Sequence, residues 1–420
     1  MNRVTKKRTK APTNITPTQT SLADFVREEL REFVFEQGMI ALQKLLEEDR
    51  DRLCGAAYER SERTVRRAGS APGELVLGGR KVRVKRPRVR DTEGEVPLDS
   101  YQYFSETDPL EKRAMEQMIV GVSTRKYQRS LEDVDARTQP RSTSKSAVSR
   151  RFVAATQKQL KECLRTQIGD LSIRCVMLDG IHLGKHLVVI AVGIDEEGQK
   201  HVLGFWEGST ENSEVCTSLL SDLVERGLDS QKSTLFVIDG GKALRQSIRR
   251  VFGKRGIVQR CQLHKMRNVI GHLPKALHAS VRQTLREAYA SKNDKTAVRR
   301  LKQLASSLSE DHPGAAASLK EGLDETITIK RFGLKKMLER SLATTNIIEN
   351  LNGSIRQLTR RVKTWKSGTM VLRWVASAVI DAKAKFRRLR GHKNMPKLVQ
   401  YLNACDDVIN KAVDEEQMAA

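Results

Sequence analysis

Two apolar runs near the middle of the chain each end at an aspartate that is followed by glycine. The first run, Ile173–Leu178, leads to Asp179, and the second, Thr234–Ile238, leads to Asp239. Short, continuous apolar runs bounded by a turn signal are typical of buried strands in an α/β sheet. Functional groups gather at strand ends in such sheets, and glycine allows a ligand to approach closely. One Asp-Gly pair alone is better explained as a turn, but two that both end core strands predict an acidic pocket.

A third acid, Glu349, lies in a segment that predicts an amphipathic helix. The polar positions at helical spacing are Asn346, Glu349, Gly353 and Arg356. The apolar positions, about 200° away around the helix, are Ile348, Leu351, Ile355 and Leu358. Asn346 and Glu349 also have capping-box spacing, although capping does not account for the continuation of the polar stripe to Arg356. We expect the apolar stripe to pack on the sheet and the polar stripe to border a cleft.

The order of elements after residue 169 predicts the fold class. Strands are expected at 173–178, 185–194 and 199–205, then a helix at 213–226, a strand at 234–238, a helix at 242–252 and a strand at 257–259. A three-stranded meander followed by helix, strand, helix and strand is the order of a ribonuclease H-like α/β domain. Residues 265–338 predict helix only. We therefore expect this domain to carry an all-α insertion.

The first part of the chain predicts a tail followed by helix. Residues 1–20 are basic and Thr-rich with no apolar stretch, so we expect a disordered tail rather than a secretory signal. Apolar residues recur at helical spacing over 21–53, which predicts an amphipathic helix or a helix pair broken near Gly38. A packing helix and a dimerisation helix both fit this pattern.

A β-hairpin is expected next. The glycine pair at 78–79 separates two runs of alternating side chains, and residues 80–90 hold seven basic residues and no acid. Arg83 and Lys85 share the face away from the valines of the second strand. A solvated basic ribbon and a ribbon that contacts DNA phosphates are both consistent with this charge.

Residues 109–160 predict three helices. One is expected over 110–119, a second over 123–134 after a glycine-containing turn, and a third after residue 144. Basic and hydroxyl residues gather in the first turns of the third helix: Lys145, Ser146, Ser149 and Arg150. This layout is that of a helix-turn-helix, which presents such residues to a DNA groove. A three-helix bundle with no DNA function has a similar pattern.

The composition indicates a polyanionic partner. Lys and Arg total 76 against 51 Asp and Glu, which leaves a formal net charge of +25 in 420 residues. Neutralising phosphates releases counterions and favours association, although ribosomal and chromatin proteins share this bias. The six cysteines are scattered, so a reducing cytoplasm is expected rather than a disulfide framework. Cys261 and His264 have no partner pair at zinc-finger spacing, and no apolar run is long enough for a membrane span.

Several ordered motifs together resemble a known family. They are 178–181, 193–198 with 202–206, 236–240, 259–268 and 344–352. Over about residues 105–395 the chain resembles the Mutator-like bacterial insertion-sequence transposases, a branch of the Asp-Asp-Glu transposases. Residues 362–368 are less typical of that family, and the region before 105 is only loosely similar.

The resemblance assigns roles by position. Asp179, Asp239 and Glu349 match the catalytic acids, Cys261 and His264 match a Cys-x-x-His signature, and Arg356 matches a basic residue seven places after the glutamate. It implies a transposase that cuts and joins DNA at the inverted-repeat ends of its element. The three carboxylates would hold two Mg²⁺ ions, or Mn²⁺, because all are hard oxygen ligands. Arg356 and His264 would contact phosphate, unless His264 merely braces the second strand, and Asn346 would border the site.

The residue patterns and the resemblance together predict how the chain is organised and where it acts. The expected parts are a tail (1–20), a helical and hairpin region for DNA contact or dimerisation (21–104), a helix-turn-helix region (105–168), a first catalytic part (169–264), the helical insertion (265–338), a second catalytic part (339–392) and a C-terminal tail (393–420). The expected partners are double-stranded terminal repeats and target DNA, with at least a dimer on DNA and no membrane. The expected location is the cytoplasm, on the nucleoid. A catalytically silent DNA-binding protein and a ribonuclease H-like nuclease without joining activity are the alternatives.

Overall fold

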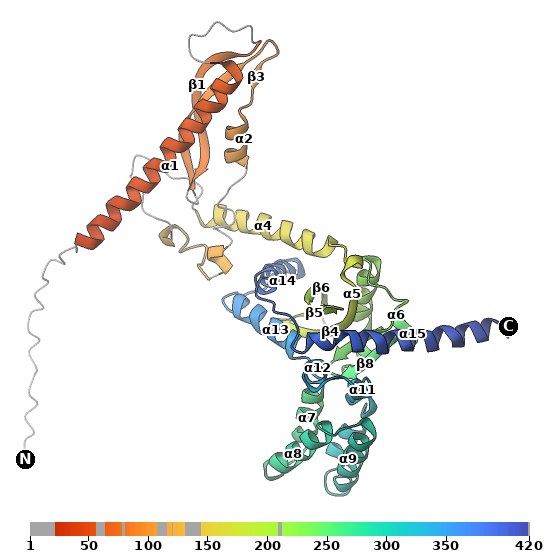
Figure 1. The fold of residues 1–420 in the computed structure, drawn as a ribbon. Helices are drawn as coiled ribbons and strands as arrows, with labels where there is room; N and C mark the ends of the chain where they lie inside the picture. The colour runs from red at the N-terminus through yellow and green to blue at the C-terminus, as the bar shows by residue number, and fades with distance from the viewer. Residues whose placement is uncertain are drawn as a thin grey trace, which may run out of the picture. The chain divides into compact units, whose positions relative to one another are not determined.

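A computed structural model describes residues 22–55, 64–77, 80–106, 116–119, 121–130, 144–208 and 212–418. The expected N-terminal tail lies outside these residues. The chain divides into two compact units, Met1–Phe152 and Val153–Ala420, and the elements of each are labelled in Figure 1. In the described part of the chain, no helix is both long and apolar enough to cross a bilayer.

A five-stranded mixed sheet forms the centre of the second unit. Its strands are β4 (Ile173–Leu183), β5 (His186–Asp195), β6 (Lys200–Gly208), β7 (Thr234–Ile238) and β8 (Gly256–Arg260). They lie in the order β6-β5-β4-β7-β8, with β4, β5 and β6 antiparallel and β4, β7 and β8 parallel. The predicted order of strands and helices is therefore confirmed, and the unit is mixed α/β.

β4 is longer than the sequence predicted. The expected strand ended at Leu178, but β4 continues to Leu183 because its second half pairs with β5 in a tight hairpin, as far as the pair Leu183 and His186. The apolar run records only the half that is buried beside β7. Asp179 consequently lies within β4, opposite Ile190 of β5, and not at the end of the strand.

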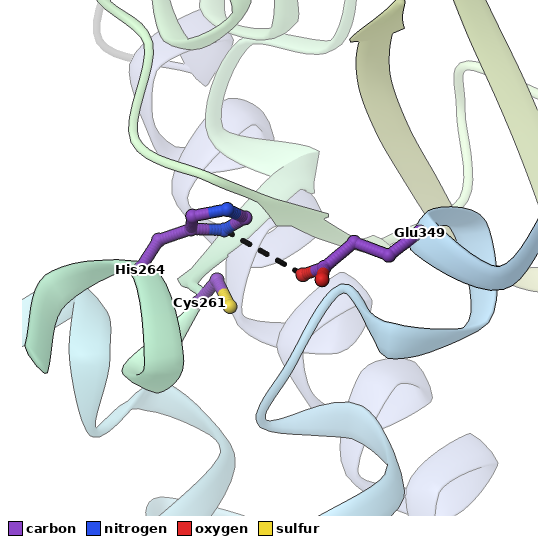
Figure 2. Close-up of side chains that lie close together, drawn as sticks. All are labelled: Cys261, His264 and Glu349. Carbon is purple, nitrogen blue, oxygen red and sulfur yellow. Dashed lines mark ion pairs between the residues drawn. The ribbon is translucent and has the colours of Figure 1, made fainter. Parts of the chain in front are cut away.

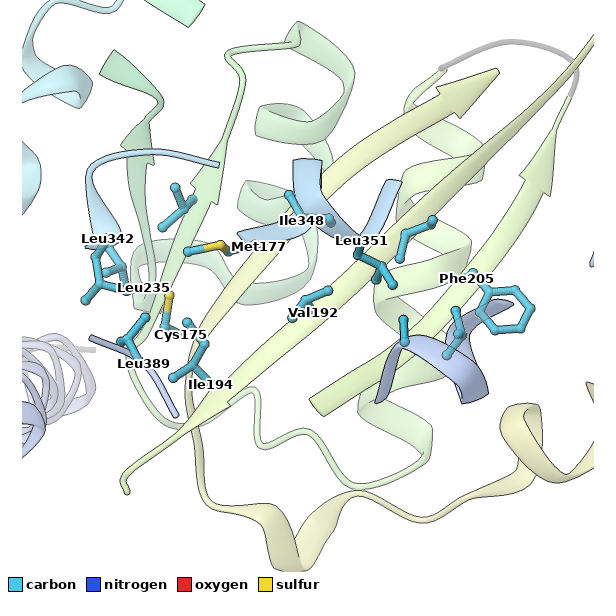
Figure 3. Packing of buried hydrophobic residues seen from close by; sticks show 14 of the residues in the cluster. Cys175, Met177, Val192, Ile194, Phe205, Leu235, Leu342, Ile348, Leu351 and Leu389 are labelled. Atoms are coloured by element: carbon cyan, nitrogen blue, oxygen red, sulfur yellow. The ribbon is translucent and has the colours of Figure 1, made fainter. Parts of the chain in front are cut away.

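Helices cover both faces of the sheet. α5 (Ser213–Glu225) and α6 (Lys242–Phe252) pack on one face, where Val176 and Leu178 of β4 are buried. α13 (Asn346–Thr359) and α14 (Gly368–Lys383) pack on the other face. Figure 3 shows Ile348 and Leu351 of α13 lying near Met177 and Val192 of the sheet. Because side chains alternate along a strand, Asp179 shares the face of Met177 and points toward α13.

The segment between β8 and α13 is helical, as predicted. Its helices are α7 (Gln262–Gly271), α8 (His278–Tyr289), α9 (Asp294–Ser307), α10 (Pro313–Lys320), α11 (Thr328–Arg331) and α12 (Lys336–Leu342), with 3₁₀ turns at Lys275–Leu277 and Asp324–Thr326. α7 to α10 have a hydrophobic core of their own. The buried Lys265 on α7 donates to the carbonyls of Ser318 (2.5 Å) and Glu321 (2.6 Å), which joins α7 to the end of α10.

Residues near the C-terminus belong to the core on the α13 face of the sheet. α15 (Met395–Met418) follows a 3₁₀ turn at His392–Asn394, and its Met395, Leu398 and Leu402 are buried on the same face of the sheet as α13. Asp406 of α15 also accepts hydrogen bonds from the backbone and hydroxyl of Ser233, just before β7.

The first unit contains a long helix beside a twisted hairpin. α1 (Leu22–Cys54) is one continuous helix, so of the two predicted alternatives the single helix is confirmed and the helix pair broken near Gly38 is not formed. A single glycine costs a helix only about 1 kcal/mol, and here a Cβ on Gly38 would lie 3.5 Å from Leu77 of the hairpin. The hairpin consists of β1 (Arg66–Leu77) and β2 (Arg80–Arg90), as expected around the glycine pair, and is followed by β3 (Glu95–Val96) and α2 (Asp99–Glu106).

The expected helix-turn-helix region is only partly described. α4 (Lys145–Arg165) begins where the third helix was predicted, and the amide of Ala147 donates to the hydroxyl of Ser144 (3.3 Å). The second helix, expected from residue 123, is wrong over the described residues, which form a turn and a 3₁₀-helix at Gln128–Ser130. Ser130 donates from its hydroxyl to the Tyr127 carbonyl (2.6 Å), and such local bonds compete with α-helix. Residues 131–143 lie outside the description.

Candidate active site

Strand pairing brings the first two acids together. The parallel ladder between β4 and β7 ends at the pair Leu178 and Ile238. Asp179 and Asp239 are the next residues on each strand, so both follow the last paired position. Both side chains are half-buried. The clustering that two separate Asp-Gly pairs only suggested is thus a consequence of the parallel register.

Asp179 is an electrostatically strained carboxylate. Burial raises its pKa to about 6, and the nearby charges of Asp239 and Glu349 act in the same direction, while His264 lowers it. Its Oδ2 accepts a hydrogen bond from Nδ2 of Asn352 on α13 (2.8 Å). Asn352 is only 1 % exposed, and its Oδ1 has no hydrogen-bond partner in the described structure. The three acids therefore concentrate negative charge around Asp179.

A backbone turn holds Asp239 in place. Its Oδ1 accepts a hydrogen bond from the amide of Gly241 (2.8 Å). Gly240 between them has φ +108°, and a Cβ there would lie 1.9 Å from Nε of the buried Arg260. Only glycine fits this backbone conformation beside that guanidinium. Glycine at this position is therefore a structural requirement of the turn that presents Asp239.

α13 presents the third acid as its periodicity predicted. Ile348, Leu351 and Ile355 are buried on the sheet. Asn346, Gly353 and Arg356 are exposed, and Glu349 is half-buried. The capping-box alternative is not supported, because Thr345 is the N-cap residue and its side chain makes no cap hydrogen bond. Glu349 Oε1 instead accepts from the Thr345 hydroxyl (2.8 Å), and its Oε2 lies 3.9 Å from Nη1 of Arg267.

Cys261 and His264 lie beside Glu349. Among the described residues, these three form the set of His, Cys, Asp and Glu ligand atoms that all lie within 4.8 Å of one another. Figure 2 shows the His264 ring facing the Glu349 carboxylate, with Nδ1 3.8 Å from Oε1 and the Cys261 thiol close by. Cys261 is fully buried. The Cys-x-x-His signature is thus part of the wall of the acidic pocket.

Hydrogen bonding polarises this pair of side chains. Burial alone would raise the pKa of Cys261, but hydrogen bonds from His264 and Thr345 outweigh burial and lower it. The bond to Cys261 raises the pKa of His264, against the opposing effect of burial, and Glu349 and Asp239 add to the rise. The two pKa shifts have the same physical cause, which is the hydrogen bonding between these side chains and Thr345.

The residues expected to contact DNA are on the surface. Arg83 and Lys85 are exposed on β2, and the opposite face of β2 buries Val82 and Val84. Lys145, Ser146, Ser149 and Arg150 are exposed on the first turns of α4. Glu95 on β3 pairs with Arg86 (2.9 Å) and Arg88 (2.7 Å), so part of the hairpin's positive charge is neutralised within the unit. Arg83 and Lys85 therefore carry part of the exposed charge of this strand, together with Lys81 and Arg90.

The sequence reasoning missed two residues that touch the acids. Asn352 bonds Asp179, and Thr345 bonds Glu349. Both lie three or four residues from Glu349, on the same edge of the polar stripe, so a stripe widened toward that edge would include them. An amide and a hydroxyl carry no charge, so the sequence does not single them out.

The chain belongs to the Mutator family of transposases, because the model of that family, described as "Transposase, Mutator family", matches residues 13–388. It is 27 % identical over 374 residues to the transposase for insertion sequence element ISRM5 of Rhizobium meliloti, which covers 87 % of this chain and 89 % of that protein. It is 26 % identical over 340 residues to the transposase for IS256 in transposon Tn4001 of Staphylococcus aureus, covering 77 % and 83 %. The transposase for IS905 of Lactococcus lactis is 26 % identical over 312 residues, covering 73 % and 76 %.

Proposed function

We propose that this chain is a metal-dependent DNA transposase that binds the terminal inverted repeats of its insertion sequence, cleaves the DNA and joins the ends to a target. The second unit would be a ribonuclease H-like catalytic domain with an all-α insertion, which its strand order β6-β5-β4-β7-β8 supports. The observation that carries the proposal is the convergence of Asp179 and Asp239 at the end of one parallel ladder, under a helix that carries Glu349.

The pocket has the chemistry of a site for two Mg²⁺ or Mn²⁺ ions. Its carboxylates are hard oxygen ligands, which these ions prefer. Burial raises the pKa of Asp179, the charges of Asp239 and Glu349 raise it further, and a bound cation would relieve the repulsion among these acids. The buried Oδ1 of Asn352, which has no partner among the described residues, is a further oxygen acceptor next to Asp179. Asp179, Asp239 and Glu349 are therefore the proposed metal ligands.

When bound, such ions activate the attacking water or 3′-hydroxyl and stabilise the leaving oxygen. The chain's own residues supply position and charge. Asn352 orients the carboxylate of Asp179, and the amide of Gly241 orients that of Asp239. Arg356 is exposed two turns beyond Glu349 on the same side of α13 and would bind a phosphate next to the reacting one. His264 is placed to bind phosphate or to hold the wall beside Glu349.

The first unit and α4 would bind the DNA ends. Arg83 and Lys85 present exposed charge along β2, suited to phosphate contacts. Lys145, Ser146, Ser149 and Arg150 face solvent at the start of α4, as a recognition helix requires. Because transposition acts on two ends, at least two copies would assemble on DNA.

The test uses purified full-length protein, a duplex carrying one terminal repeat, and a plasmid target with Mg²⁺ or Mn²⁺. Asp179→Asn, Asp239→Asn and Glu349→Gln should each abolish cleavage and joining while leaving binding of the repeat within about twofold. Glu225→Gln is the matched control, because Glu225 is an exposed acid on α5, on the opposite face of the sheet. It should behave as wild type.

Each other outcome has a defined meaning. Cleavage without joining would favour the nuclease alternative. Specific binding of the repeats by the wild type with neither reaction, when the true ends are supplied, would favour a silent DNA-binding protein. Wild-type joining by any one of the three acid variants would remove that residue from the site.

A further inference from the structure

A buried hydroxyl connects the Cys-x-x-His signature to Glu349. Thr345 is completely buried, and its Oγ1 lies 3.3 Å from Cys261 Sγ, 3.3 Å from His264 Nδ1 and 2.8 Å from Glu349 Oε1. One oxygen atom therefore touches all three side chains of the cluster drawn in Figure 2. The shortest of its contacts is the one to the Glu349 carboxylate.

Backbone hydrogen bonds fix the position of the Thr345 hydroxyl relative to Asp239. The amide of Cys261 donates to the carbonyl of Ile238 (2.7 Å), the residue just before Asp239. The amide of Gln262 donates to the Ala343 carbonyl (3.0 Å), and the amide of Thr345 donates to Cys261 Sγ (3.4 Å). These hydrogen bonds thus connect the end of β7, through Cys261, to Thr345, the N-cap residue of α13.

The effect of the Thr345 hydroxyl depends on which neighbouring atom receives its proton. A threonine hydroxyl has one proton to donate and two lone pairs that accept. Glu349 Oε1 at 2.8 Å and Cys261 Sγ at 3.3 Å are both acceptors for this single proton, and the shorter contact directs it at Glu349 Oε1. An imidazole Nδ1–H of His264 can donate to one of the lone pairs of the hydroxyl oxygen. The arrangement therefore holds the carboxylate in a single orientation.

We propose that Thr345 is a positioning residue for Glu349: its hydroxyl, held by Cys261 and His264, fixes the carboxylate in the orientation needed to bind a divalent cation together with Asp179 and Asp239. This inference rests on the proposed function, because it takes Glu349 as a metal ligand. It also gives the Cys-x-x-His signature a role, which is to fix the third acid relative to the second. Residues that orient metal ligands typically contribute about 10- to 100-fold in metal affinity.

The same three side chains could instead hold a zinc ion directly. A thiolate, an imidazole and a carboxylate are all zinc ligands, and their atoms lie within 4.8 Å of one another. The Thr345 hydroxyl, however, already lies within hydrogen-bond distance of each of those atoms. The geometry therefore favours a hydrogen-bonded cluster, and zinc binding is the outcome that the test must exclude.

The experiment measures Mn²⁺ binding to the full-length protein without DNA, by the electron paramagnetic resonance signal of free Mn²⁺. Thr345→Val keeps the shape of the side chain and removes the hydroxyl, and it should weaken Mn²⁺ binding about 10-fold or more. Thr345→Ser keeps the hydroxyl and should restore most of the affinity. Thr359→Val is the matched control, because Thr359 is also buried on α13 but its hydroxyl donates to the Ile355 carbonyl of the same helix (2.7 Å). It should bind Mn²⁺ as the wild type does.

Three results would overturn the proposal. Wild-type Mn²⁺ affinity in Thr345→Val would show that the hydroxyl does not orient the ligand. Equal losses in Thr345→Val and Thr345→Ser would mean that side-chain shape matters and the hydroxyl does not. Tight Zn²⁺ binding by the wild type that Cys261→Ser abolishes would assign the cluster to zinc.

The failure of the proposed function looks different. If Glu349→Gln binds Mn²⁺ as tightly as the wild type, Glu349 is not a metal ligand, and the site assignment itself is wrong. If Glu349→Gln loses binding while Thr345→Val retains it, the site stands and only the role of Thr345 falls.

Discussion

Asp179 should make the metal-free protein less stable at neutral pH than at mildly acidic pH. Its pKa is raised from 3.8 to about 6 by burial and by Asp239, so the folded state retains the proton to a higher pH than the unfolded state. The free energy of unfolding therefore falls as pH rises between these two values. Nearly the whole penalty is present above about pH 7, and it is absent below about pH 3.

The size of this penalty follows from the same two values. The difference between 3.8 and about 6 corresponds to about 3 kcal/mol. Asp179→Asn removes the charge and keeps a carbonyl oxygen that can accept the hydrogen bond from Asn352. The variant should therefore be more stable than the wild type by up to about 3 kcal/mol at pH 7.5, and the difference should fall to about 1 kcal/mol at pH 4.5.

Urea denaturation in EDTA at pH 7.5 and pH 4.5 measures this difference. The three tryptophans, Trp206, Trp365 and Trp374, all lie in the second unit, so their fluorescence reports unfolding around the acidic pocket. Glu225→Gln serves again as the exposed-acid control. A gain in Asp179→Asn that is equal at both pH values, or no gain at pH 7.5, would refute the argument. Adding Mg²⁺ should stabilise the wild type and narrow the gap, because the cation offsets the repulsion.

Two further predictions concern the hairpin and the turn at Asp239. Replacing Arg83 and Lys85 with Ala should weaken DNA binding without changing sequence preference. Titrations in increasing NaCl should show that the slope of log affinity against log salt falls in magnitude by up to about two. An unchanged slope would mean that these two side chains of β2 are solvated and do not contact DNA phosphates. Gly240→Ala should reduce unfolding free energy by more than about 2 kcal/mol, because it combines positive φ with a clash at Arg260. Gly253→Ala, at φ +54° with open space around it, should cost only about 1–2 kcal/mol in the same denaturation assay. Equal losses of unfolding free energy in the two variants would mean that the Arg260 side chain moves aside at little cost.

Much of the fold was readable from local patterns. β7 and α6 have the bounds that their apolar run and helical spacing predicted. The burial of Ile348, Leu351 and Ile355 followed from periodicity alone. Such features depend on neighbouring residues, because the apolar pattern of a helix or strand recurs within a few residues of the sequence. The errors arose where distant segments decide the outcome, as when β5 extends β4 past Leu178.

The sequence by itself determined that three acids stand at two core strands and one amphipathic helix, because burial and periodicity are written in consecutive residues. Only the tertiary structure decided what touches those acids. The contact between Asn352 and Asp179 joins residues 173 positions apart, and that between Thr345 and Cys261 joins residues 84 positions apart. Strand register and helix packing bring such residues within hydrogen-bond distance, and neither can be read from periodicity in the sequence. Charge could identify the acids, whereas the neutral amide and hydroxyl that hold them became visible only in the folded protein.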